Sequence, residues 1–107
     1  MNQQQFIESI ENTYKTGVEI IKIKNSDYAN SDNPFKNFES AQIAGINIDR
    51  AILVRVLDKI SRISNLLNKE ASVKDESLED TILDCINYLA ILKAYRESNI
   101  ISDLTTS

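Results

Sequence analysis

Three cationic residues in the second half of the chain recur at helical spacing and are suited to binding phosphate. Arg55, Lys59 and Arg62 are separated by four and three positions, which places them within about 60° of arc on a helix, away from its apolar stripe. Arginine offers a fork of donors and lysine a compact charge, and both bind phosphate oxygens. The alternative is a solvated helix face whose charges are neutralised by local acids.

Further along the chain, Asp80, Asp84 and Asn87 form a second set of polar residues at helical spacing. They are again separated by four and three positions and therefore share one helical face. Residues 83–92 read LDCINYLAIL, an almost continuous apolar run that predicts a helix buried on most sides. Because an unpaired buried carboxylate is costly, Asp84 should have a cation or a proton as its partner.

Two kinds of cation suit these carboxylates. In one arrangement, Asp80 and Asp84 form structural ion pairs with the basic residues at positions 55, 59 and 62. In the other, they bind Mg²⁺ together with Asp58, because hard divalent cations prefer carboxylate oxygens. The spacing fits both arrangements, since ion pairs perturb carboxylates as readily as active sites do.

A polar segment before these helices carries aromatic and amide side chains. Three of its aromatic residues fall within eleven positions, a mixture that suits the stacking and edge recognition of a nucleotide base. Aromatic residues beside a proline can instead pin a loop onto the core. The candidates for binding base or ribose in this segment are Asp27, Tyr28, Asn33, Phe35, Asn37 and Phe38.

The composition restricts the available chemistry. The chain has no histidine, which excludes histidine-based nucleophilic catalysis, histidine acid–base catalysis and histidine-ligated zinc. Its one cysteine, Cys85, allows no internal disulfide and no thiolate zinc site, and it falls on an apolar face where it is expected to be a core residue. Any metal chemistry must therefore be of the magnesium kind, with Mg²⁺ as the candidate cofactor.

The net charge limits the classes of binding partner, and the N-terminal sequence bears on where the protein is located. A net charge of −4 argues against binding a nucleic-acid polymer or an anionic membrane, because both need a basic surface. No apolar run approaches the roughly 20 residues that span a bilayer. The start of the chain, MNQQQ, lacks the basic and apolar regions of a signal peptide. We therefore expect a cytoplasmic protein that binds neither a nucleic-acid polymer nor a membrane.

The hydrophobic pattern predicts an all-α fold of three main helices and one short helix. A first helix is expected over about residues 4–25, because apolar residues recur every three or four positions. Residues 25–34 form a polar loop, and Pro34 is suited to the first turn of a short helix over 35–45 that Gly45 ends. Three residues of this short helix are expected to face inward: Phe35, Phe38 and Ala41.

Two longer helices are expected in the remainder of the chain. The first covers about residues 48–68 with Asn47 as its N-cap. The second follows a polar turn at 69–74, is capped by Asp75 and ends near Arg96, and the polar tail 98–107 is expected to be flexible. The inward stripe of the 48–68 helix comprises Ile52, Val56, Ile60, Ile63 and Leu67, widened by Leu53 and Leu57.

The length predicts one domain over residues 1–107, with a core over about 5–97. The apolar stripes are wider than three helices of one small chain can bury. We therefore expect a homo-oligomer, a dimer or larger, to complete the helical bundle.

Several stretches of the chain, taken in order, resemble a known family. This family comprises small phage and bacterial proteins called nucleotide modification associated domains, first type, and the resemblance covers about residues 20–95. It implies a small all-α protein of phage type that is connected with nucleotides. The stretches that carry it are KNSDY (24–28), NPFKNF (33–38), ILVRVLDKISRISNLL (52–67) and DESLEDTILDCINYLAILK (75–93).

A more distant similarity is to the all-α MazG-like nucleoside triphosphate pyrophosphohydrolases. In those enzymes, acidic motifs on two helices bind Mg²⁺ on the triphosphate. The sequence from Asp80 to Asp84 is similar to the second motif, and Asn87 and Tyr88 stand in its continuation. The similarity adds these last two residues to the candidates for binding base or ribose, and it implies a MazG-like helical bundle.

The first acidic motif of those enzymes is matched only in part. Asp58 stands at one acidic position, but Lys59 and Arg62 stand where the enzymes place further carboxylates. Because Mg²⁺ on a triphosphate is usually held by several carboxylates, cations at these positions favour phosphate binding over metal binding.

These observations predict a nucleotide-binding protein of phage type that holds a nucleoside phosphate or a small nucleotide signal and sequesters it. The alternative is a Mg²⁺-dependent MazG-like pyrophosphohydrolase with Asp58, Asp80 and Asp84 as metal ligands. A second alternative is a structural or protein-interaction module without a ligand, in which the polar stripes are ion pairs.

Overall fold

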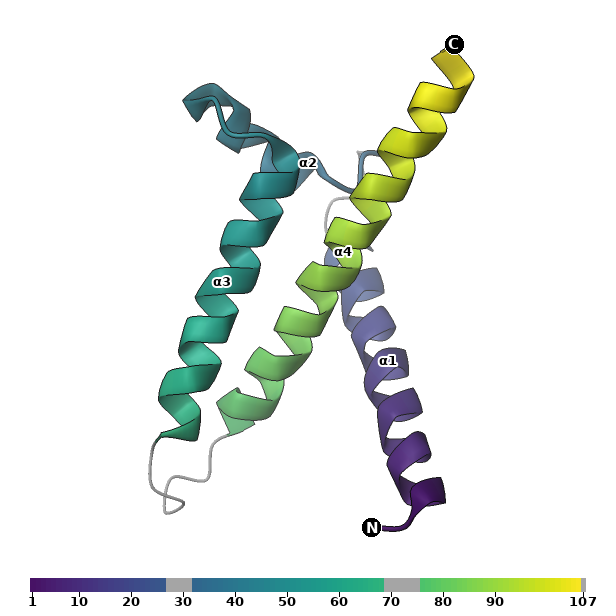
Figure 1. The fold of residues 1–107 in the computed structure, drawn as a ribbon, viewed down its shortest axis with the longest axis vertical. Coiled ribbons are helices and arrows are strands. Elements are labelled where there is room, and N and C mark those ends of the chain that lie inside the picture. Colours follow the sequence, from purple (N-terminus) through teal and green to yellow (C-terminus); the bar gives the residue numbers. More distant parts are fainter. Residues whose placement is uncertain (27–31, 69–75, 107) are drawn as a thin grey trace. The chain divides into compact units, whose positions relative to one another are not determined.

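The computed structural model describes residues 1–26, 32–68 and 76–106 (Figure 1). These residues form four α-helices, one of them short, together with one 3₁₀ helix and no strand. The predicted all-α class is thus confirmed. The chain divides into two compact units, Met1–Asp32 and Asn33–Ser107, and each is described by itself.

The first unit is built on one helix, α1, which covers Gln3–Ser26. It begins with a reciprocal cap, in which the backbone N–H of Gln5 donates to Asn2 Oδ1 and that of Asn2 donates to Gln5 Oε1, each over 2.9 Å. These bonds satisfy two donors that a helix N-terminus leaves without intrahelical partners. The helix expected over about 4–25 is therefore present, with Gly17 in its interior.

The second unit opens with two short helical turns. Helix α2 covers Lys36–Glu39 and the 3₁₀ helix η1 covers Ser40–Ala44, where one short helix was expected. Asn33 fixes the start, because its Oδ1 accepts the backbone N–H of Phe35 over 3.0 Å and its side-chain amide donates to Glu39. Gly45 ends η1 as predicted, in the left-handed conformation with φ 75°.

Helices α3 (Ile48–Leu67) and α4 (Glu76–Thr106) form an antiparallel hairpin (Figure 1). Asn47 precedes α3 with the extended backbone of an N-cap, although its side chain makes no capping bond. Apolar side chains from both helices meet in a small core, and Ile52 is fully buried. Among the residues whose burial the structure describes, the buried apolar ones are Ile48, Ile52, Val56 and Cys85, and Cys85 therefore occupies the core position expected for it.

The apolar stripe of α3 is only partly buried. Ile60 and Leu67, which the sequence pattern placed in the main inward stripe, are exposed in the structure, as are Leu53 and Leu57. The pattern was wrong here because it gives the width of the apolar stripe but not how much of that width one neighbouring helix covers.

Helix α4 is longer than the sequence pattern indicated. It continues past the expected end near Arg96 and runs to Thr106. The segment after Arg96 contains no glycine or proline that would stop a helix, and Lys93 and Glu97 form an ion pair across the expected end. The prediction failed because it relied on the polarity of the tail, which does not by itself end a helix.

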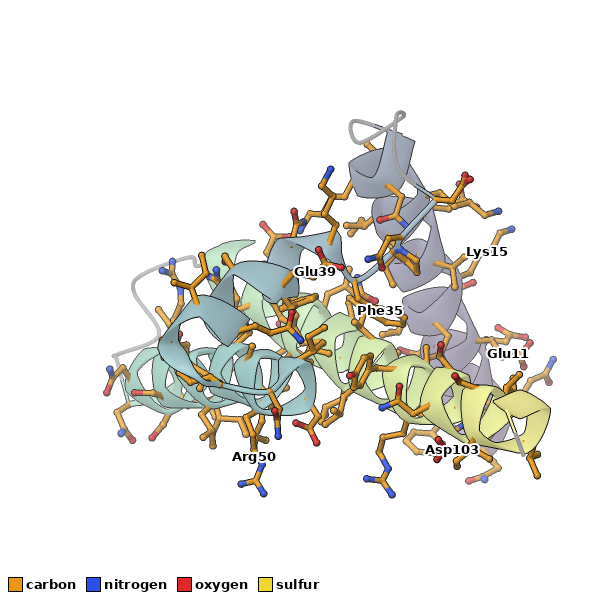
Figure 2. The ribbon with its side chains drawn as sticks, turned by 90° about the horizontal axis from the view of Figure 1, so that it is seen from above. Glu11, Lys15, Phe35, Glu39, Arg50 and Asp103 are labelled. Carbon is orange, nitrogen blue, oxygen red and sulfur yellow. The ribbon has the colours of Figure 1, made fainter. Side chains whose placement is uncertain are left out.

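Two aromatic pairs join the short helical turns to α4. The rings of Phe35 and Tyr95 are 5.1 Å apart and those of Phe38 and Tyr88 are 6.4 Å apart, both in an edge-to-face arrangement. Figure 2 shows Phe35 directed toward α4. The inward orientation predicted for Phe35 and Phe38 is therefore confirmed.

Within the described residues, no helix is both long enough and apolar enough to cross a membrane.

Candidate functional site

A shallow depression between α3 and α4 brings together the cations predicted to bind phosphate. It has a volume of about 390 Å³ and lies within the second unit. We call it the cation depression. Its lining residues are Arg55, Asp58, Lys59, Ser61, Arg62, Asn65 and Tyr88.

The helical repeat of α3 explains why these side chains meet. Arg55, Arg62 and Asn65 recur at intervals of seven and three residues, and such intervals return to one side of an α-helix. This side flanks the buried Ile48/Ile52/Val56 face and is not part of it. Arg55 and Arg62 are exposed there, and their guanidinium groups can reach an anion that enters from solvent.

Lys59 lies closer to the core than the two arginines and forms an ion pair across the helical hairpin. Its Nζ is 3.3 Å from Oδ2 of Asp84, and the two side chains are 29% and 28% exposed. One of the two arrangements that the spacing allowed, the ion pair, is therefore formed between these residues. The pair also connects the wall of the depression to α4.

Tyr88 is the residue of α4 that lines the depression. It follows Asp84 by one helical turn, and its half-buried ring packs edge-to-face with Phe38. This contact restricts the orientation of the Tyr88 ring. The depression therefore combines guanidinium groups, which suit a phosphate, with an aromatic side chain, which suits a nucleotide base.

Other candidates for binding base or ribose lie outside the lining of the depression. Phe35 and Phe38 contact tyrosines of α4, and the side chain of Asn33 accepts the backbone N–H of Phe35 just before α2. Asn37 is exposed, Asn87 is buried on α4, and neither lines the depression. Asp27 and Tyr28 lie outside the described residues. The assignment of these residues to a base or ribose stays a prediction.

The three predicted metal ligands do not meet at one place in the structure. Asp58 lines the depression, Asp84 pairs with Lys59, and Asp80 is exposed on α4. Among the described residues, no group of three or more His, Cys, Asp or Glu side chains is gathered that could hold a metal ion. The described carboxylates thus do not form a magnesium site by themselves, and the Mg²⁺ assignment stays a prediction.

Sequence reasoning missed two residues of the depression, Ser61 and Asn65. Asn65 follows Arg62 by three positions, and Ser61 follows Asp58 by three, so helical spacing places them beside residues that were selected. Both are neutral, so charge does not mark them as candidates in the sequence. Each adds hydrogen-bonding groups to the wall of the depression.

Comparison with family models, with curated proteins and with solved structures finds no match for this chain.

Proposed function

We propose that the protein binds a nucleoside phosphate in the cation depression and acts by holding this ligand. The observation that carries the proposal is the convergence of Arg55, Lys59 and Arg62 with Tyr88 on one depression. The arginines would bind the phosphate oxygens, and Tyr88 would lie against the base. In the same proposal, the helical hairpin is part of a MazG-like bundle, and the nucleotide comes from the cytoplasm.

The charges of the depression support phosphate binding. Within the described part of the chain, Lys59 pairs with Asp84, while neither Arg55 nor Arg62 forms an ion pair. A purely structural stripe would instead commit these cations to carboxylates on the neighbouring helix. Two guanidinium groups at one depression are suited to an anion from solution, because each can donate two parallel hydrogen bonds.

The alternative of hydrolysis receives less support. A pyrophosphohydrolase would need several carboxylates around its magnesium ions, and the described residues gather no such group. The ion pair with Lys59 also occupies Oδ2 of Asp84. We therefore derive no catalytic step and propose binding.

Calorimetric titration tests this function. The purified protein is titrated with nucleoside 5′-monophosphates and 5′-triphosphates of each common base, and with inorganic phosphate. Saturable binding of at least one nucleotide, tighter than that of inorganic phosphate, is the expected result. The absence of binding to every nucleotide would reject the proposal.

A pair of arginine variants links this binding to the depression. Arg62→Ala should weaken nucleotide binding about tenfold or more, because a charge-assisted bond to phosphate is lost. Arg50→Ala is the matched control, since Arg50 lies on the same helix outside the depression and points away from α4 (Figure 2). An equal loss in both variants would indicate a general charge effect.

The same pair separates binding from a structural module without a ligand. If the arginines only stabilised the fold, Arg62→Ala would lower the melting temperature, and neither the variant nor the wild type would bind a nucleotide. We expect the melting temperature of Arg62→Ala to stay close to that of Arg50→Ala, because both side chains are exposed.

A further inference from the structure

We propose that the cation depression selects a ligand with a single phosphate group and that Asp58 is the residue that disfavours di- and triphosphates. The inference rests on the proposed nucleotide-binding function and names the class of ligand within it. It is carried by the position of one carboxylate among the cations that line the depression.

The net charge of the depression is lower than its three cations suggest. Lys59 is paired with Asp84 over 3.3 Å, which neutralises most of its charge toward a ligand. The groups that remain are the guanidinium groups of Arg55 and Arg62 and the carboxylate of Asp58. Two positive charges therefore face one negative charge, and the wall offers a small positive excess.

This excess matches a single phosphate better than a chain of phosphates. A phosphate monoester carries about −1.5 to −2 charges near neutral pH, and each additional phosphate adds further negative charge. The first phosphate can be held by the two guanidinium groups. A second or third phosphate would add negative charge to a wall that already holds the Asp58 carboxylate.

The size of the depression is compatible with such a ligand. Its volume of about 390 Å³ lies near the lower end of the range for small-molecule sites, roughly 300 to 1,000 Å³. The depression must hold both the phosphate group and the base that would lie against Tyr88. A compact ligand with one phosphate satisfies both requirements.

The expected effect of Asp58 is modest, because its side chain is exposed and salt screens its charge. Replacing Asp58 by asparagine removes the charge and keeps the shape. We expect Asp58→Asn to raise the affinity for a triphosphate by roughly three- to fivefold and that for a monophosphate by less than about twofold. The difference should shrink as the salt concentration rises.

Magnesium distinguishes this role from that of a metal ligand. If Asp58 excludes polyphosphates by its charge, Asp58→Asn strengthens triphosphate binding without Mg²⁺. If Asp58 instead bound Mg²⁺ on the triphosphate, Asp58→Asn would weaken triphosphate binding in the presence of Mg²⁺. The two roles therefore predict changes of opposite sign.

The experiment is calorimetric titration of the wild type and Asp58→Asn with the mono-, di- and triphosphates of one nucleoside, for each of the four ribonucleosides. Each titration is run in EDTA and again in Mg²⁺. Glu79→Gln is the matched control, because it removes one negative charge from an exposed residue of α4 outside the depression. The control should leave the ratio of mono- to triphosphate affinity unchanged.

We expect the wild type in EDTA to bind the monophosphate at least as tightly as the triphosphate, and Asp58→Asn to shift this ratio toward the triphosphate. A wild type that prefers the triphosphate, or a ratio that Asp58→Asn leaves unchanged, overturns the selectivity but keeps the proposed function. Weaker triphosphate binding by Asp58→Asn in Mg²⁺ also overturns it. If no phosphate of any nucleoside binds, both proposals fail.

Discussion

The ion pair between Lys59 and Asp84 connects the two longest helices of the second unit at the edge of the cation depression. Both side chains are less than one-third exposed, so their attraction is screened less than that of a surface pair. The pair also holds the Lys59 ammonium group in place, and the nearby Asp84 carboxylate reduces the electrostatic attraction between this group and a bound ligand. One contact thus bears on stability and on binding.

We expect removal of this pair to destabilise the protein measurably. Asp84→Ala should lower the free energy of unfolding by about 1–3 kcal/mol, between the values typical of exposed and fully buried pairs. Urea unfolding of Asp84→Ala, Lys59→Ala and the double variant gives the coupling energy directly.

The pair Lys93–Glu97 is the matched control, because it lies on α4 with side chains that are 77% and 56% exposed. A cycle on this pair should give only about 0.3–0.5 kcal/mol. A coupling energy no larger for Lys59 and Asp84 would contradict the role that we assign to their partial burial.

At the scale of the elements, the turn between η1 and α3 determines where α3 begins. Gly45 has φ 75° and donates its backbone N–H to the carbonyl of Gln42 over 3.0 Å. The next residue, Ile46, donates to the carbonyl of Ala41 over 3.1 Å. These bonds require a left-handed residue at position 45, a conformation that glycine adopts without strain.

Gly45→Ala should therefore destabilise the protein by about 1–2 kcal/mol. A Cβ atom at this position would meet nothing within 4 Å, so the cost comes from the backbone and not from a clash. Gly45→Asn is the comparison, because asparagine tolerates the left-handed conformation better than alanine. Thermal or urea unfolding should rank the proteins as wild type, then Gly45→Asn, then Gly45→Ala.

The elements were largely predictable from sequence because local signals mark their ends. Asn47 and Gly45 lie where a cap and a stop were expected, and α3 follows directly after them. The end of α4 was not predictable in this way, because the tail has no residue that must stop a helix. The contacts of Phe35 and Phe38 with α4 were also not predictable in detail, because helical periodicity does not encode which residues of another helix they meet.

The candidate site was predictable to the extent that it lies on one helix. Helical spacing brought Arg55, Lys59 and Arg62 together, and the structure places all three at one depression. The contribution of α4 was harder to predict, because the register between two helices depends on how their side chains pack. The observed register places Asp84 within ion-pair distance of Lys59 and places Tyr88 in the lining of the cation depression.

At the scale of the whole molecule, α3 carries a second apolar face. Four large side chains recur at intervals of four, three and seven residues, the spacing of a helix that packs on another helix. No charged residue interrupts this spacing, since Ser64 occupies the intermediate position. We call these residues the α3 seam; they are Leu53 (38% exposed), Leu57 (54%), Ile60 (49%) and Leu67 (65%).

Within the second unit the α3 seam is uncovered, which favours the expected homo-oligomer, because soluble monomers rarely expose large contiguous apolar patches. A seam with heptad spacing is complementary to a second copy of itself, and two helical hairpins joined in this way form a four-helix bundle. We therefore predict a homodimer. Light scattering at about 50 μM protein should give twice the chain mass of 12.1 kDa.

Leu57→Glu should convert this dimer to a monomer, since it would place two like charges within a dry interface. Ile43→Glu makes the same change at a residue of η1 that is 92% exposed, and it should leave the dimer intact. A wild type that is monomeric at this concentration would contradict the prediction.

The same variant tests whether each protomer binds its ligand independently. Because Arg55 and Arg62 flank the opposite side of the buried face, Leu57→Glu should keep the nucleotide affinity of the wild type.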